Sequence, residues 1–185
     1  MEITNKARVN ESGNVYTDIP VLDLGPYMNG EEGALEELAS EVRHIQETIG
    51  FWAIINHGVS WQILEETYNQ LKRFFALPDA DKLRYRINEL SVGYVPPKST
   101  KYISSIINQN TKKDLNETLI TALERPDDHP LIVARTRFVG PNQWPEGLQG
   151  FREAIVAYQQ EILKLGRKLL PIFAVALELP PKYFD

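Results

Sequence analysis

The feature that most constrains the fold is the apolar periodicity near the C-terminal end of the chain. Apolar residues recur there at spacings of three and four, which is the pattern of one helix face. They are Leu148, Phe151, Ile155, Tyr158, Ile162, Leu165, Leu169, Ile172 and Ala176. The pattern predicts a long helix over about 148–178. Pro171 lies inside it, and since an interior proline costs about 3 kcal/mol, we expect a kink or a break there.

Such a wide apolar stripe needs a partner surface, and the rest of the chain offers few elements to provide one. Two further segments show helical periodicity. One is 35–49, which Gly50 should end, and the other is 61–75, with an apolar face of Trp61, Leu64, Tyr68, Leu71 and Phe75. Three segments have the β-branched or apolar content of strands, namely 19–24, 51–55 and 116–121. The inventory predicts an α+β fold.

Several finer expectations follow from the same patterns. The strand at 51–55 is continuously apolar, which predicts that it is buried. Glycine and proline predict a turn at 25–30 and a turn and loop at 91–99. Residues 1–17 are a polar lead-in, and 18–185 form one region.

Composition excludes several classes of protein. The formal net charge of −5 argues against a surface for nucleic acid or an anionic membrane, because phosphate binding needs a basic face. The 185 residues contain no cysteine, which excludes disulfides, iron–sulfur clusters and a thiol nucleophile. The polar start lacks the apolar core of a secretory signal, and we expect a cytoplasmic protein.

Motif searches find no catalytic centre. A two-histidine, one-carboxylate iron site needs a His-x-Asp or His-x-Glu pair and a distant second histidine. None of His44, His57 and His129 fits, so we expect no metal ligand in this chain. His129 adjoins Asp127 and Asp128, a trio that could bind a cation, although a solvated turn is the default for such a loop. Dinucleotide-binding, Walker and nucleophile-elbow motifs are absent from the sequence.

His57 ends an apolar strand within the stretch GFWAIINHGV, at 50–59. Two interpretations are open, a ligand or base at the strand end, and a ring that bonds to the backbone and fixes the corner. We favour the second, because a lone histidine without partners is weak evidence of a site.

The order of several blocks resembles one family closely. The blocks are IPVLDL at 19–24, GFWAIINHGV at 50–59, FFALPDADKLRYR at 74–86, GYVPP at 93–97, NQWP at 142–145 and ALELPPKYFD at 176–185. Together they resemble the N-terminal region of the isopenicillin N synthase-like, non-haem iron(II) and 2-oxoglutarate-dependent oxygenases. The resemblance covers nearly the whole chain from residue 18.

The resemblance implies a fold for this chain and a location for the catalytic residues. It implies helices and strands that flank a double-stranded β-helix, or jelly roll, and a catalytic jelly-roll half that we expect to begin after Asp185. Iron(II) and 2-oxoglutarate, with ascorbate as a possible addition, would bind in that half. It also implies that Asn56, His57 and Gly58 form a structural corner, and that Tyr94, Val95 and Ile120 approach a small-molecule substrate.

Two functions remain open at this point. The first is the N-terminal part of an oxygenase that hydroxylates, desaturates or cyclises a small organic molecule, with the jelly-roll half as its partner and no nucleic acid or membrane. In that case this segment alone should be inactive. The second is a stand-alone, non-catalytic binding or interaction module with the same flanking fold.

Overall fold

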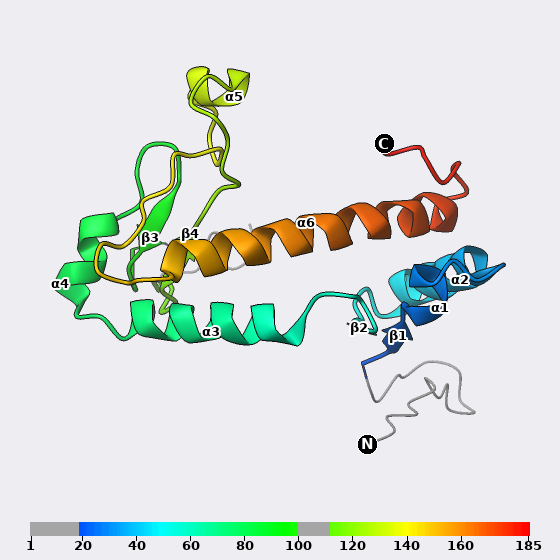
Figure 1. Cartoon of the computed structure of the whole chain (residues 1–185). Helices are drawn as coiled ribbons and strands as arrows, with labels where there is room; N and C mark the ends of the chain where they lie inside the picture. Colours follow the sequence, from blue (N-terminus) through cyan, green and yellow to red (C-terminus); the bar gives the residue numbers. More distant parts are fainter. Residues whose placement is uncertain (1–18, 100–111) are drawn as a thin grey trace. The chain divides into compact units, whose positions relative to one another are not determined.

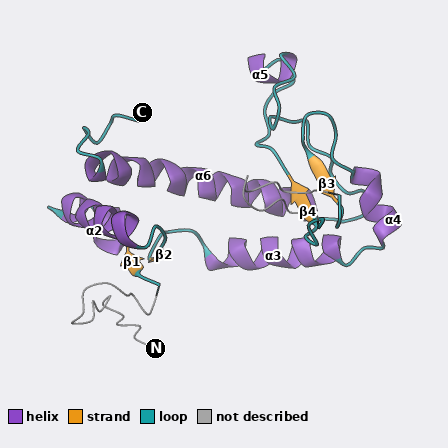
Figure 2. Ribbon diagram, turned by 180° about the vertical axis from the view of Figure 1, so that it is seen from behind, coloured by secondary structure: helices purple, strands orange, loops and turns teal. Residues whose placement is uncertain are grey.

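The computed structural model describes residues 19–99 and 112–185, so the predicted lead-in over 1–17 lies outside the described residues. These parts divide into two compact units. The first comprises the described residues up to Ser60 together with Gln160–Asp185, and the second comprises the described residues of Trp61–Gln159. Helices account for far more of the described chain than the strands, which are short, and both kinds of element are present, as predicted for a mixed α and β fold (Figures 1 and 2).

The first unit is built on a parallel pair of strands, β1 (Val21–Asp23) and β2 (Ala53–Ile55), with Leu22 opposite Ile54. The connection between them contains α1 (Gly25–Met28) and α2 (Ala34–Thr48). Parallel strands need such a crossover, and a helix usually provides it. Residues 25–30 were expected to form only a turn, but Pro26 suits the first turn of a helix and α1 forms there.

The end of α2 follows the sequence prediction. Gly50 has a φ of 89°, a left-handed conformation that glycine adopts without steric cost, and its N–H donates to the Ile45 carbonyl at 2.8 Å. The helix packs its apolar stripe on the core of this unit, which also receives the last turns of the long C-terminal helix. Buried residues of this core are Leu22, Leu24, Leu38, Ala39, Val42, Ile45, Ile172 and Ala176.

The prediction that 51–55 is buried is wrong. Phe51 is 56% exposed and Ile55 is 36% exposed, whereas Ile54 packs against the core. Neighbouring side chains of a strand point to opposite faces, so only the face shared by Leu22 and Ile54 meets the helices. In the described residues, the other face of this pair is left to solvent.

The second unit begins with α3 (Trp61–Phe75), followed by α4 (Asp79–Lys82) and the single 3₁₀ turn η1 (Leu83–Tyr85). An antiparallel pair comes next, β3 (Gly93–Val95) and β4 (Thr118–Ile120), and then α5 (Pro130–Val133). The loop expected at 91–99 therefore contains a strand. The strand predicted at 116–121 is confirmed, though shorter.

The buried face of α3 agrees with the prediction only in part: Leu71 and Phe75 pack against the core of this unit as predicted. Trp61 and Tyr68 are largely exposed, and the buried side chains are those of Thr67, Gln70 and Phe74. The polar pair is tolerated inside because its groups are bonded: Thr67 Oγ1 donates to the Ala154 carbonyl at 3.3 Å. Hydrophobic periodicity cannot register a buried face that is partly polar.

The predicted long helix is confirmed as α6 (Phe151–Ala176). Its residues up to Gln159 belong to the second unit and the remainder to the first. Of the two outcomes expected at Pro171, a kink or a break, the break does not occur, because the helix continues through the proline. Core packing of Ile172 holds the following turn in place, and the Tyr27 hydroxyl donates to the Lys168 carbonyl at 2.9 Å just before the proline.

Candidate functional site

The β3–β4 pair carries the three residues that were predicted to approach a substrate. Its register pairs Gly93 with Ile120 and Tyr94 with Leu119. Residues directly opposite each other on antiparallel strands share a face, and successive residues alternate. Val95 and Ile120 therefore lie on one face of the pair, and Tyr94 lies on the other.

Tyr94 belongs to the core of the second unit. Its side chain is 1% exposed, and its ring centroid lies 5.8 Å from that of Phe74 in an edge-to-face arrangement. Phe151 and Ile155 complete the buried cluster. The structure therefore separates the three predicted residues, since Val95 and Ile120 are half-buried on the other face.

A polar network fixes the inner face of the pair. The Tyr94 hydroxyl donates to Glu117 Oε2 at 2.6 Å, and Lys82 Nζ donates to the same oxygen at 2.8 Å. The Lys82 ammonium also lies 5.5 Å from the centroid of the Tyr94 ring. The network ties α4 to both strands, because its three members come from α4, β3 and the residue before β4.

The network shifts the pKa values of its three members, each in the direction that favours the ion pair and a neutral tyrosine. The hydrogen bond from Lys82, and then that from Tyr94, lowers the pKa of Glu117. The hydrogen bond to Glu117 raises the pKa of Lys82 despite the burial of the ammonium. Burial raises the pKa of Tyr94, and its bond to Glu117 adds to that effect. The ion pair and a neutral tyrosine are therefore the stable state near neutral pH.

Gly93 permits a close approach at the start of β3. Its φ is 126°, and a Cβ built there would lie 2.4 Å from Gln143 Nε2 and 2.6 Å from the Tyr85 carbonyl oxygen. The Gln143 amide uses this space to donate to the carbonyls of Arg86 and Val92, at 3.0 Å and 2.8 Å. Only glycine fits this position without displacing backbone.

The Asn-His-Gly corner lies in the first unit and is held by its own hydrogen bonds. The Val59 N–H donates to His57 Nδ1 at 3.2 Å, which is the ring-to-backbone contact that the favoured interpretation requires. The Asn56 amide donates to Asp23 Oδ1 at 2.7 Å and so links the ends of β2 and β1. Gly58 has a φ of 78° at the turn.

The described residues do not fit a metal centre. Across residues 19–99 and 112–185, no group of three His, Asp or Glu side chains is placed to hold an ion. The interpretation of Asp127, Asp128 and His129 as a cation site is therefore wrong. His129 instead caps α5, with Nδ1 accepting from the Leu131 N–H at 3.2 Å.

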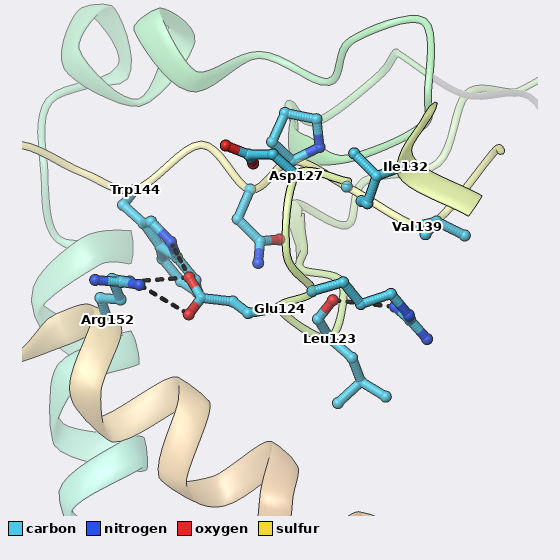
Figure 3. A pocket seen from close by; sticks show the side chains of 11 residues that line it. Leu123, Glu124, Asp127, Ile132, Val139, Trp144 and Arg152 are labelled. Carbon is cyan, nitrogen blue, oxygen red and sulfur yellow. Dashed lines mark hydrogen bonds and ion pairs between the residues drawn. The ribbon is translucent and has the colours of Figure 1, made fainter. Parts of the chain in front are cut away.

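A pocket of about 270 Å³ opens beside the loops that follow β4 (Figure 3). Glu124 receives three hydrogen bonds at 2.9 Å on its wall, one from Trp144 Nε1 and two from the Arg152 guanidinium. The bonds from Arg152, above all, lower the pKa of Glu124. The Asn142 side-chain amide forms two hydrogen bonds with the backbone of Ala122: its Oδ1 accepts from the N–H, and its Nδ2 donates to the carbonyl. Because these polar groups are hydrogen-bonded to one another, we assign them a structural role: they hold the segment after β4 to the start of α6 and to the loop before it.

Sequence reasoning missed both of these ion pairs. Lys82 and Glu117 are 35 positions apart, and Glu124 and Arg152 are 28 apart. Charged residues at such separations carry no periodicity. A weak signal existed for Lys82 alone, since it stands in the FFALPDADKLRYR block on which the resemblance rests.

Comparison with known proteins agrees with this architecture. A family model described as non-haem dioxygenase in morphine synthesis N-terminal matches residues 19–147. The chain belongs to this family of dioxygenase N-terminal regions. Within the described parts of the chain, no helix has the length and apolar character needed to cross a membrane.

Two curated proteins illustrate the sequence similarity of this chain to longer proteins. Azadirone synthase LFS of Melia azedarach is 37% identical over 153 residues, which cover 81% of this chain and 44% of that protein. The 2-oxoglutarate-Fe(II) type oxidoreductase hxnY of Emericella nidulans is 29% identical, with 90% of this chain and 48% of that protein covered. The chain thus spans about half the length of these curated relatives.

Solved structures show the same relation. A full-length Neurospora crassa protein crystallised in complex with alpha-KG superimposes with a TM-score of 0.73 at 26% identity, over 98% of this chain and 53% of that one. A putative 2OG-Fe(II) oxygenase family protein from Caulobacter crescentus shares the fold, with a TM-score of 0.70 at 21% identity, over 90% and 50% of the two chains.

Proposed function

We propose that this chain is the N-terminal portion of an Fe(II)/2-oxoglutarate-dependent oxygenase that oxidises a small organic molecule by hydroxylation, desaturation or cyclisation. One combination of observations carries the proposal. The chain matches the dioxygenase N-terminal family over 19–147, and its described residues offer no three-ligand metal set. A flanking region of an iron enzyme has this combination, and a complete metal centre does not.

Iron(II) and 2-oxoglutarate, with ascorbate as a further addition, would supply the oxidising chemistry from a jelly-roll half outside these residues. The names of the relatives support this assignment, among them a probable iron/ascorbate oxidoreductase of Dictyostelium discoideum. Because the described residues do not fit the iron, the part proposed for this chain is to bind and orient the substrate. A cytoplasmic location goes with this proposal.

The β3–β4 pair is the element proposed to touch the substrate. Val95 and Ile120 share its outer face and offer apolar contact there. Tyr94, with Lys82 and Glu117 behind it, would act indirectly by fixing the strands. Asn56, His57 and Gly58 are proposed as structural residues, since His57 spends its Nδ1 on the backbone of the corner.

The test begins with the gene. The proposal expects an open reading frame past the codon of Asp185, with a His-x-Asp, a later His and an Arg-x-Ser in it. With iron(II) and dioxygen present, the longer product should convert 2-oxoglutarate to succinate and carbon dioxide, and chromatography of the organic acids measures the succinate. Chelation of the iron should abolish the conversion.

A stop codon directly after Asp185 would contradict the proposal and favour the stand-alone binding module. A longer product that binds iron without consuming 2-oxoglutarate would also contradict it. For a substrate contact, Val95→Ala and Ile120→Ala in the longer product should raise KM with little change in melting temperature. A matched exposed substitution, Leu177→Ala, should leave KM unchanged, because this side chain is 62% exposed directly after α6.

A further inference from the structure

A tight turn precedes β3 and holds one buried hydroxyl. The Asn88 side chain accepts from the N–H groups of Leu90 and Val92 at 3.0 Å and 3.1 Å, and the Asn88 backbone bonds to Val92 and Ser91. Ser91 adopts a left-handed conformation with a φ of 61° and is 8% exposed. The turn is therefore a rigid support for the Ser91 hydroxyl.

A second loop is fastened to this turn and carries Arg137. The Phe138 N–H donates to the Leu90 carbonyl at 2.7 Å, and Arg137 Nε donates to Ser91 Oγ at 2.6 Å. The Arg137 guanidinium carbon lies 4.7 Å from the centroid of the Phe138 ring. A hydrogen bond at Nε and an aromatic ring against the guanidinium together fix the orientation of this side chain.

The outward-facing part of Arg137 is not engaged. Among the described residues, no hydrogen bond or ion pair joins its two terminal nitrogens to another group. Arg135, two positions earlier, is paired with Glu89. A guanidinium held by its Nε, with both terminal nitrogens unengaged, presents the planar fork that matches a carboxylate or phosphate.

The fork is held beside the start of β3, the strand that carries part of the predicted substrate face. Ser91 is two residues from Gly93, so their Cα atoms are at most about 7.6 Å apart, and Gly93 pairs directly with Ile120. The segment that carries Arg137 also exposes apolar side chains: Leu131, Val133 and Phe138 are 42%, 69% and 54% exposed. A cation beside exposed apolar side chains suits an amphipathic anion better than inorganic phosphate.

We propose that Arg137, oriented by Ser91 and Phe138, is a specificity-determining residue that binds the carboxylate of an apolar organic acid. The inference rests on the proposed function, because it names the substrate class for the β3–β4 face. It predicts that the substrate carries a carboxylate within reach of this loop and an apolar body against Val95 and Ile120.

The test uses the 185-residue chain with ¹⁵N-labelled arginine and follows the Arg137 Nε–H signal by NMR. The probes are phenylacetate, its neutral amide phenylacetamide, and inorganic phosphate. Phenylacetate should shift the signal saturably, and phenylacetamide should not. Arg137→Gln should weaken phenylacetate binding at least fivefold, measured by the shifts of β3 and β4 amides. Arg137→Lys, which keeps the charge but loses the fork, should also weaken it.

The matched control is Arg135→Gln, which makes the same change of charge two positions away and should alter affinity less than twofold. Equal weakening by the two glutamine variants would overturn the inference, and so would equal binding of acid and amide or no binding of either. Phosphate binding as tight as that of phenylacetate would also overturn it. If Arg137→Gln fails to fold by circular dichroism, Arg137→Lys decides. The NMR measurement needs no iron, 2-oxoglutarate or turnover. A failure of this inference can therefore be distinguished from a failure of the proposed function, which is tested by succinate formation in the longer product.

Discussion

Replacing Lys82 by methionine should destabilise the chain by about 2 kcal/mol. The change removes the 2.8 Å hydrogen bond to Glu117 and keeps most of the aliphatic volume. Hydrogen bonds to charged groups contribute about 1.5–3 kcal/mol. The contact with Asp79 adds little, because that side chain is 86% exposed.

The expected loss is smaller than for a fully buried pair, where removing one partner costs about 3–5 kcal/mol. Glu117 keeps the hydroxyl of Tyr94, and its side chain is 31% exposed, so water can replace part of the lost contact. Urea unfolding followed by circular dichroism measures the difference. For a chain of this size, it corresponds to a fall in melting temperature of about 4–8 °C.

A double-mutant cycle isolates the pair. Lys82→Met and Glu117→Gln together should cost at least about 1 kcal/mol less than the sum of the single changes, because each alone leaves its partner unsatisfied. Lys164→Met is the matched control: this lysine is 66% exposed, against 6% for Lys82, so the loss of its ion pair with Glu161 should cost less than about 0.5 kcal/mol. A coupling near zero, or a Lys82→Met cost equal to the control, would refute the reasoning.

Three further predictions concern Gly93, Glu117 and His57. Gly93→Ala should cost more than about 3 kcal/mol in urea unfolding, because its Cβ would meet the Tyr85 carbonyl oxygen, whereas Gly147→Ala, with positive φ but open space, should cost about 1 kcal/mol; equal costs would contradict the close-approach argument. Because the pKa of Glu117 is lower in the folded than in the unfolded chain, its ionisation stabilises the fold above the unfolded-state pKa of about 4.3, and this stability is lost as the pH falls through the folded-state pKa. Urea midpoints measured from pH 7 to 3 should therefore fall less in Glu117→Gln than in the native chain. Parallel pH profiles of the two chains would contradict this prediction. His57→Ala should cost about 1–3 kcal/mol by removing a backbone contact, and should leave kcat of the longer product unchanged; a normal melting temperature with abolished turnover would reverse the assignment.

The elements that sequence reasoning predicted well are those with strong local patterns. The long helix α6 and the end of α2 at Gly50 follow from spacing and from the conformational freedom of glycine. The strand β4 follows from β-branched content. Each depends on residues near in sequence, which is why a single chain suffices to predict it.

The errors arose where tertiary contacts override local pattern. Trp61 and Tyr68 are apolar yet exposed, while Thr67 and Gln70 are polar yet buried through hydrogen bonds to side chains and backbone. The resemblance grouped Tyr94 with Val95 and Ile120 and carried no information on faces; strand alternation puts Tyr94 on the opposite face, in the aromatic core. Pairing partners and faces are set by residues distant in sequence.

The candidate site was predictable only in outline. The resemblance of the GYVPP block pointed to Tyr94, Val95 and Ile120, and the structure pairs the two strands that carry them. It gave no indication of Glu117 behind Tyr94, nor of Arg137 beside Ser91. Both contacts join loops and strands through side chains whose spacing has no period.

Calorimetric titration with iron(II) under anaerobic conditions, in the presence of 2-oxoglutarate, tests the central claim most directly. The 185-residue chain should show only weak binding, because its described residues hold no set of three ligands. The longer gene product should bind one equivalent tightly. Tight one-to-one binding by the 185-residue chain, lost on replacement of His57, would contradict the account.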